Sequence, residues 1–403
     1  MPDEFRAGRW AAAACLCGLA VSGASPAVFA AQPGQEAQAA QTAPAVPAPL
    51  LVAHVAKLGD FDYATRTAAA RAVRRAPATE AAPALVAAVT TSVDSYVRFK
   101  AFVLLTGLLD PRLEDFSRAA LTDKNDRLRQ AAFDWLERHP VPALAPRLIQ
   151  LLETEQAEFV RPSLMRALAA LDADPAVRTA LVRETARGLD IFRGAVIEAL
   201  GLRRATFAVD ALAKVVAVDG PLRDVAAMAL GRIGGSEAVA LLAPVHDKDP
   251  GVELTLRAAQ CLAEQQCDAV RDDIVRQWPT SAARGTAGAA AGALAVMAER
   301  GDARAMALLV EAGIAGVRDL RDHAAVALGT VALRAPDVVL GWMADNPAQG
   351  SGVLALLKDG FDLMEEDVAE EAFYASVRAS YWKAADGSPV RASAAALIDG
   401  LDF

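Results

Sequence analysis

The sequence predicts an all-α fold, a solenoid of about ten stacked helical hairpins. Two observations lead to this prediction: a composition of small apolar residues, and an arginine-led motif that recurs at intervals of 30 to 32 residues. Hydrophobic residues make up 54% of the 403 residues and aromatic residues 5%, so alanine, leucine and valine dominate. Such side chains suit closely packed helices. There is no sustained apolar-polar alternation of the kind that half-buried strands show.

The recurring motif is an arginine, then a small apolar residue three positions later, then Ala-Leu-Gly six to eight positions later. It is clearest at Arg193, Arg223 and Arg321. Less perfect copies begin at Arg66, Arg98, Arg129 and Arg161. An acidic or amide residue often lies four positions before the arginine slot, as a helix N-cap would. A hairpin of about 30 residues cannot bury its apolar faces alone, so the copies are expected to stack on one another.

Each period divides into two helices. Apolar residues at helical spacing follow each arginine, and a second helix then starts at its own signal. Asp110-Pro111 and Asp174-Pro175 are two such signals, with a cap residue before a proline in the first turn. We call the arginine-led helix of each pair the first helix and its successor the second helix.

The segments 219–231 and 317–329 resemble the HEAT repeat family, in its short variety known from phycobilin lyases. The resemblance covers about residues 58–345, with weaker copies to 401. Tetratricopeptide repeats are the main rival, but their Trp-Leu-Gly-Tyr pattern is absent. The resemblance implies a right-handed superhelix of antiparallel helix pairs. It also implies that the second helices line the concave, partner-binding surface.

The N-terminus has the pattern of a secretory signal over residues 1–30. Arg6 and Arg9 precede an apolar run from Trp10, and small residues allow cleavage after Ala30 or Ala31. An uncleaved anchor is the alternative, although the run is shorter than the ~20 residues that span a bilayer. Residues 31–49 are rich in Ala, Gln and Pro and read as a disordered linker. We expect the solenoid to occupy 50–403, with capping helices from about 351, in a periplasmic or secreted protein without a transmembrane segment in its mature part.

The repeated arginine is interpreted as structural rather than as a phosphate-binding row. Recurrence at one repeat slot favours a ladder in which each guanidinium bonds an acidic group or carbonyl of a neighbouring repeat. This arginine ladder comprises Arg66, Arg98, Arg129, Arg161, Arg193, Arg223 and Arg321.

Three basic residues are candidates for ligand binding. Arg183, Lys214 and Arg276 occupy similar places in second helices, separated by one and two repeats. Stacking would align them on the expected concave face. A solvated face with incidental lysine and arginine is the alternative, and it is the simpler interpretation.

The sequence contains no recognisable catalytic or metal-binding motif. The four histidines lie far apart without metal-binding spacing, and we expect neither a metal nor a cofactor. The acidic cluster Glu365, Glu366, Asp367, Glu370 and Glu371 is interpreted as the solvated first turns of a helix. The aromatic residues after it, from Phe373 to Trp382, are expected to plug the open end of the superhelix.

Cys261 and Cys267 are predicted to form a disulfide. Along one continuous helix, six residues would separate their Cα atoms by ~9 Å, beyond the ~7 Å limit for a bridge. The repeat register instead places Cys261 near the end of a first helix and Cys267 in the turn before Asp268. Two free thiols are the alternative.

The leading functional hypothesis is a non-catalytic protein-binding or scaffolding protein of the bacterial cell envelope, which presents its concave surface to a protein or peptide. The formal charge of −9 disfavours general nucleic-acid binding. The alternative is a helical enzyme or enzyme subunit, lyase-like or glycan-acting, with an unrecognised site. Fold analogy alone decides neither.

Overall fold

The computed structural model describes residues 48–218, 220–281, 285–316, 318–364 and 366–401. Those residues form α-helices and short 3-10 turns and contain no strand, so the all-α solenoid prediction is confirmed. The expected signal, residues 1–30, lies outside the described residues, as does the linker up to residue 47. The first described helix begins at Ala48, two residues before the expected start of the solenoid.

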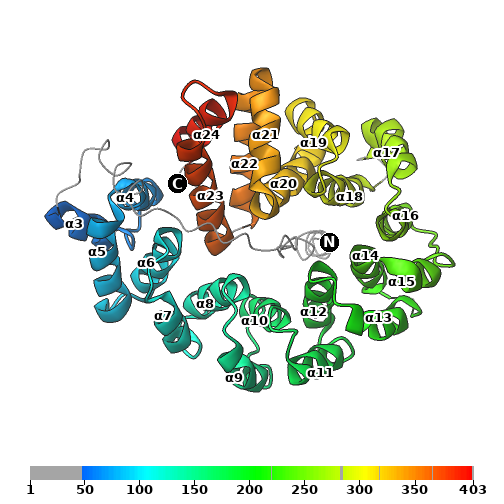
Figure 1. The fold of residues 1–403 in the computed structure, drawn as a ribbon, viewed down its shortest axis with the longest axis horizontal. Helices are drawn as coiled ribbons and strands as arrows, with labels where there is room; N and C mark the ends of the chain where they lie inside the picture. Colours follow the sequence, from blue (N-terminus) through cyan, green and yellow to red (C-terminus); the bar gives the residue numbers. More distant parts are fainter. Residues whose placement is uncertain (1–47, 219, 282–284, 317, 365, 402–403) are drawn as a thin grey trace, which may run out of the picture. The chain divides into compact units, whose positions relative to one another are not determined.

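The chain divides into two compact units (Figure 1). The larger unit comprises residues 137–364. The smaller unit is discontinuous, because it joins residues 48–136 to residues 366–401. The N-terminal and C-terminal helices of the described chain therefore belong to the same unit.

In the larger unit the first helices are α10 (Val160–Ala169), α12 (Asp190–Leu202), α14 (Arg223–Ile233), α16 (Pro250–Glu264), α18 (Ala287–Glu299), α20 (Arg318–Arg334) and α22 (Gly350–Met364). The second helices are α9 (Ala145–Leu151), α11 (Pro175–Glu184), α13 (Val209–Val216), α15 (Gly235–Leu242), α17 (Asp268–Ser281), α19 (Ala303–Ala315) and α21 (Pro336–Asp345). In the smaller unit the helices are α3 (Ala48–Lys57), α4 (Tyr63–Arg75), α5 (Ala78–Thr91), α6 (Ser95–Leu108), α7 (Leu113–Ala120), α8 (Asp126–Arg138), α23 (Asp367–Lys383) and α24 (Pro389–Gly400).

Helix starts follow the acidic residues of the repeat. Asp62, Asp94 and Asp249 are the N-caps of α4, α6 and α16, and each carboxylate accepts a backbone N–H of the first turn. Asp174 caps α11 in the same way, as its Asp-Pro signal predicted. Asp110 is the exception, because α7 starts three residues after it and its carboxylate pairs with Arg112 instead.

The first helices of the larger unit pack directly against one another and form its concave layer, while the second helices form the convex layer (Figure 1). Close packing depends on small residues. A Cβ on Gly201 of α12 would lie 2.6 Å from the Cα of Ala229 in α14, and one on Gly231 of α14 would lie 2.5 Å from the carbonyl oxygen of Ala259 in α16. The expectation that the second helices are concave is wrong. The repeat period fixes the pairing of helices, whereas the curvature follows the layer in which the backbones approach more closely.

The smaller unit is built around a contact between its two segments. Helix α23 packs against α6 and α24. Phe373 and Tyr374 are 2% and 5% exposed there. Phe373 and Tyr374 are thus buried within the smaller unit, whereas Trp382 is 46% exposed. That the aromatic residues from Phe373 to Trp382 plug the open end of the superhelix stays a prediction. Helix α22, at the start of the expected cap, continues the first-helix layer of the larger unit.

Among the described residues, no single helix has both the length and the apolar character needed to cross a bilayer. The segments Leu320–Arg334 and Pro336–Asp345 satisfy those criteria only when taken together, and they are bent by 113° relative to each other.

Candidate functional site

The concave layer of the larger unit presents one face of each first helix. In α14, Asp224, Val225, Met228 and Arg232 are partly exposed, whereas Ala226 and Leu230 are fully buried. The partly exposed residues recur at helical spacing and so share one face. Because the opposite face packs on the second helices, this face is turned to the concave side.

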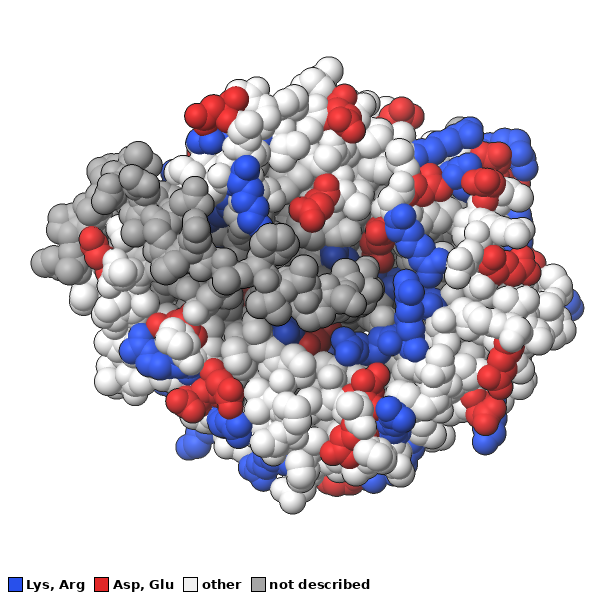
Figure 2. All heavy atoms as spheres, viewed as in Figure 1, with Lys and Arg blue, Asp and Glu red and all other residues white. Residues whose placement is uncertain are grey.

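Arginines gather where these helices end. We define the arginine cluster as five residues at the C-terminal ends of α12, α14, α18 and α20: Arg203, Arg204, Arg232, Arg300 and Arg334. Figure 2 shows a band of lysine and arginine side chains in the middle of the view, over the first-helix layer. A cation at a helix C-terminus is stabilised by the helix dipole, which gives each arginine a local structural reason.

Curvature brings members of the cluster together across the larger unit. Arg334 of α20 lies 3.6 Å from Glu198 of α12 and 3.1 Å from Glu299 of α18. Burial lowers the pKa of Arg300, and the nearby positive charge of Arg204 lowers it further. Arg334 and Glu198 are 136 positions apart in the sequence, and Arg300 and Arg204 are 96 apart.

Ion pairs hold some of these arginines but not all. Arg204, Arg300 and Arg334 lie near only two glutamates that these contacts identify, Glu198 and Glu299. Arg203 and Arg204 make no ion pair with any described residue, and Arg204 is exposed. The guanidinium of Arg204 is therefore accessible to an anionic group.

The backbone at Arg204 is unusual for an arginine. Its φ of 52° lies in the left-handed region, which glycine occupies at helix ends without steric cost. The amide of Ala205 donates to the carbonyl of Leu200 and completes the helix end. Leu109 and Gln265 adopt the same conformation as C-caps of α6 and α16, so this is a recurring way in which helices of this chain end.

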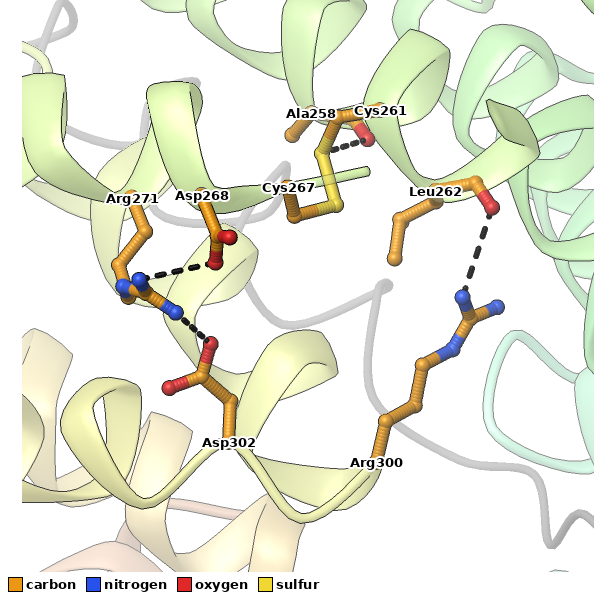
Figure 3. The surroundings of a disulfide bond; sticks show 8 residues. All are labelled: Ala258, Cys261, Leu262, Cys267, Asp268, Arg271, Arg300 and Asp302. Atoms are coloured by element: carbon orange, nitrogen blue, oxygen red, sulfur yellow. Dashed lines mark hydrogen bonds and ion pairs between the residues drawn. A yellow bond between two sulfur atoms is a disulfide. The ribbon is translucent and has the colours of Figure 1, made fainter. Parts of the chain in front are cut away.

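The predicted disulfide lies beside the cluster (Figure 3). Cys261 and Cys267 are bonded, with their Cα atoms 4.8 Å apart. Cys261 is in the last turn of α16 and Cys267 lies in the connection to α17, as the repeat register predicted. The neighbouring carbonyl of Leu262 accepts from Nη1 of Arg300 at 3.5 Å. The disulfide thus fixes the helix end that Arg300 contacts.

The ladder arginines contact loop carbonyls and acidic residues. The guanidiniums of Arg66, Arg98, Arg129 and Arg161 each donate to the carbonyl six positions earlier. Arg193 and Arg321 donate to the carbonyl eight positions earlier. Acids farther along the chain pair with four of them, in the pairs Arg98–Asp123, Arg161–Glu184, Arg223–Asp247 and Arg321–Asp359. All seven guanidiniums thus bond a backbone carbonyl or an acidic residue. That these contacts serve stability rather than binding stays a prediction.

The three predicted binding residues lie in the convex layer, on α11, α13 and α17. Arg183 pairs with Glu153 at 2.8 Å and Glu184 at 2.9 Å. Arg276 is 69% exposed and pairs with Asp273. Lys214 is exposed. They do not share the concave face on which we expected them, and their role in binding stays a prediction.

The acidic cluster in the smaller unit is not a solvated helix start. Glu371 is 2% exposed and accepts from Nε of Arg74 at 2.7 Å, while Asp367 pairs with Lys100. Burial and the negative charge of Asp367 raise the pKa of Glu370 to about 8. Sequence reasoning missed these partners because Arg74 and Lys100 lie in α4 and α6, far from α23 in the sequence.

Among the described residues, no group of three or more histidine, cysteine, aspartate or glutamate side chains has the arrangement of a metal site.

Comparisons with known proteins give only distant likenesses. No family model and no curated protein matches the chain. Among solved structures, an engineered protein is 17% identical, with a TM-score of 0.34, over 88% of this chain and 99% of its own. The phycocyanin lyase CpcE–CpcF complex of Nostoc is 21% identical, with a TM-score of 0.36, over 62% and 99%. Human deoxyhypusine hydroxylase is 23% identical, with a TM-score of 0.28, over 54% and 85%. Similarities at this level say nothing about what this chain binds or catalyses.

Proposed function

We propose that this HEAT-like solenoid is a non-catalytic binding or scaffolding protein of the bacterial cell envelope, and that it presents the concave layer of the larger unit to a protein partner. The observation that carries the proposal is the repeated, partly exposed face of the first helices, which ends in the arginine cluster. Such a surface suits many modest contacts, a few of them dominant. The signal-like pattern of residues 1–30 supports export.

A photo-crosslinking pair tests the surface. A photoreactive amino acid replaces Met228, on the exposed face of α14, in the full-length protein expressed in its own bacterium. The matched control carries the same amino acid at Arg147, exposed on the convex helix α9. We expect a discrete crosslinked protein from position 228 and none from position 147. Crosslinks from position 147 alone would contradict the concave surface as the binding site.

Export is tested separately. Residues 1–50 are fused to alkaline phosphatase, which becomes active only outside the cytoplasm. We expect activity in whole cells, and a matched fusion without residues 1–30 should be inactive. An inactive full fusion would place the protein elsewhere and remove the cell-envelope part of the proposal.

The enzyme alternative would require carboxylates free to act. Asp367 and Glu371 converge in the smaller unit, but each is bonded to a cation. A carboxylate bonded to a cationic side chain suits a structural pair better than a general acid. For Asp367 and Glu371 this arrangement favours the binding function, whereas the neighbouring Glu370, whose pKa is raised to about 8, keeps the proton that a general acid needs.

A further inference from the structure

We propose that the arginine cluster binds an acidic segment of the protein partner. This inference rests on the proposed function and names the chemistry that the concave surface recognises. Its basis is the gathering of arginines at helix ends that curvature brings together, with Arg203 and Arg204 lacking ion-pair partners among the described residues. The chain as a whole carries a formal charge of −9, so this local positive surface contrasts with its surroundings.

The geometry favours a carboxylate-bearing chain. Guanidinium groups bind carboxylates through paired hydrogen bonds. Arg203 and Arg204 are adjacent in sequence at the end of α12, and Arg300 lies at the end of α18. Donors from two helix ends suit a ligand that carries more than one carboxylate. Arg334 is already paired with Glu198 and Glu299, which shows that carboxylates of this chain itself occupy the edge of the cluster.

Two features keep the donors in place. Arg204 is held in a left-handed turn by the hydrogen bond from Ala205 to Leu200. Arg300 contacts the carbonyl of Leu262, beside the disulfide that fixes the end of α16 (Figure 3). A backbone that is already ordered loses no further conformational entropy on binding. An acidic segment therefore meets arginines whose backbone positions are fixed in advance.

The probe is a short fluorescein-labelled polyglutamate peptide, and its binding to the full chain is followed by fluorescence anisotropy. The test variant is Arg203→Gln/Arg204→Gln. The matched control is Arg147→Gln/Arg304→Gln, which removes the same charge from exposed positions on the convex helices α9 and α19. We expect the test variant to weaken binding by about tenfold or more and to flatten its salt dependence. The control should change binding by less than about twofold.

A second variant guards against misfolding. Arg204→Gly places glycine where φ is 52°, so we expect it to weaken peptide binding while the thermal midpoint stays equal or rises. Equal losses in the test and control variants, or no binding by the wild-type protein, would overturn the proposal. Tighter binding of a DNA duplex than of polyglutamate would also overturn the proposal, because the cluster would then prefer nucleic acid to an acidic peptide.

Failure here is distinguishable from failure of the proposed function. A crosslinked partner at position 228, with peptide binding indifferent to Arg203 and Arg204, would retain the concave binding surface and remove the acidic segment. Loss of the crosslink itself would remove the surface.

Discussion

The guanidinium of Arg74 and the carboxylate of Glu371 form a buried ion pair between residues 297 positions apart in the sequence. The Glu371 side chain is 2% exposed and that of Arg74 15%. Gly107 of α6 makes room for the pair, because a Cβ there would lie 2.8 Å from Oε2 of Glu371. The pair joins the N-terminal and C-terminal segments of the smaller unit.

Arg74→Ala should therefore lower the free energy of unfolding by about 3–5 kcal/mol, because it leaves the charge of Glu371 buried and unpaired. Arg75→Ala is the matched control, since Arg75 pairs with Asp399 at the surface and exposed pairs contribute about 1 kcal/mol or less. Urea unfolding followed by circular dichroism compares them. Similar midpoints for both variants would contradict a stabilising role for the buried pair.

The raised pKa of Glu370 predicts a pH dependence. Between its ordinary value of 4.5 and about 8, Glu370 keeps a proton in the folded state and loses it in the unfolded state. The unfolded state then binds fewer protons, so the free energy of unfolding falls as pH rises through this window. Glu370→Gln should reduce that fall, and the exposed control Glu114→Gln should preserve it. Parallel pH profiles for wild type and Glu370→Gln would refute the prediction.

The ladder arginines should act on stability rather than on binding. Arg193→Ala, Arg223→Ala and Arg321→Ala are each expected to lower the free energy of unfolding by about 1–3 kcal/mol, because each loses charge-assisted bonds. Arg161→Ala should cost more, since Arg161 is 6% exposed and its partner Glu184 is fully buried. Unchanged denaturant midpoints together with lost peptide binding would show that these arginines form a functional surface instead.

Close approach of the first helices predicts opposite effects for two glycines. Gly201→Ala should destabilise by about 1–3 kcal/mol, because the added methyl group meets the backbone of Ala229. Gly292→Ala, in the middle of α18 with nothing near its Cβ, should stabilise by about 0.5–1 kcal/mol. Thermal unfolding measures both. Equal shifts of the two midpoints would mean that the layer relaxes to admit the methyl group.

The disulfide predicts a protected pair of cysteines. The protein purified under oxidising conditions, denatured and alkylated without reduction, should carry no adduct on Cys261 or Cys267 in peptide mapping by mass spectrometry. The loop is short, so the bridge should stabilise by only about 2 kcal/mol through restriction of the unfolded chain. Adducts on both residues would show free thiols.

Local signals in the sequence predicted much of the fold. The period from Arg66 to Arg223 revealed the repeat, and Asp62, Asp94 and Asp249 marked helix starts. The position of Cys267 in a turn followed from the same register. Each of these depends on residues within one hairpin, where sequence distance and spatial distance agree.

The candidate site depends on contacts between residues that are far apart in the sequence, and no local sequence pattern predicts such contacts. Arg204 and Arg300 approach each other only because small rotations accumulate over several repeats. The identity of the concave layer depends on how closely Gly201 and Gly231 let backbones approach. Glu371 looked solvated because its partner Arg74 belongs to the other end of the chain.

The discontinuous smaller unit has a consequence for how the protein reaches its native state. During synthesis, helices α3 to α8 emerge first, but α23, on which they pack, emerges near the end. Until then the apolar side of α6 and the guanidinium of Arg74 have no native partner from α23. Closing a loop of this length costs about 5 kcal/mol of chain entropy if the intervening residues are unstructured. Folding of the larger unit first would shorten that loop, so a nascent or truncated chain should depend on a chaperone until its last helices arrive.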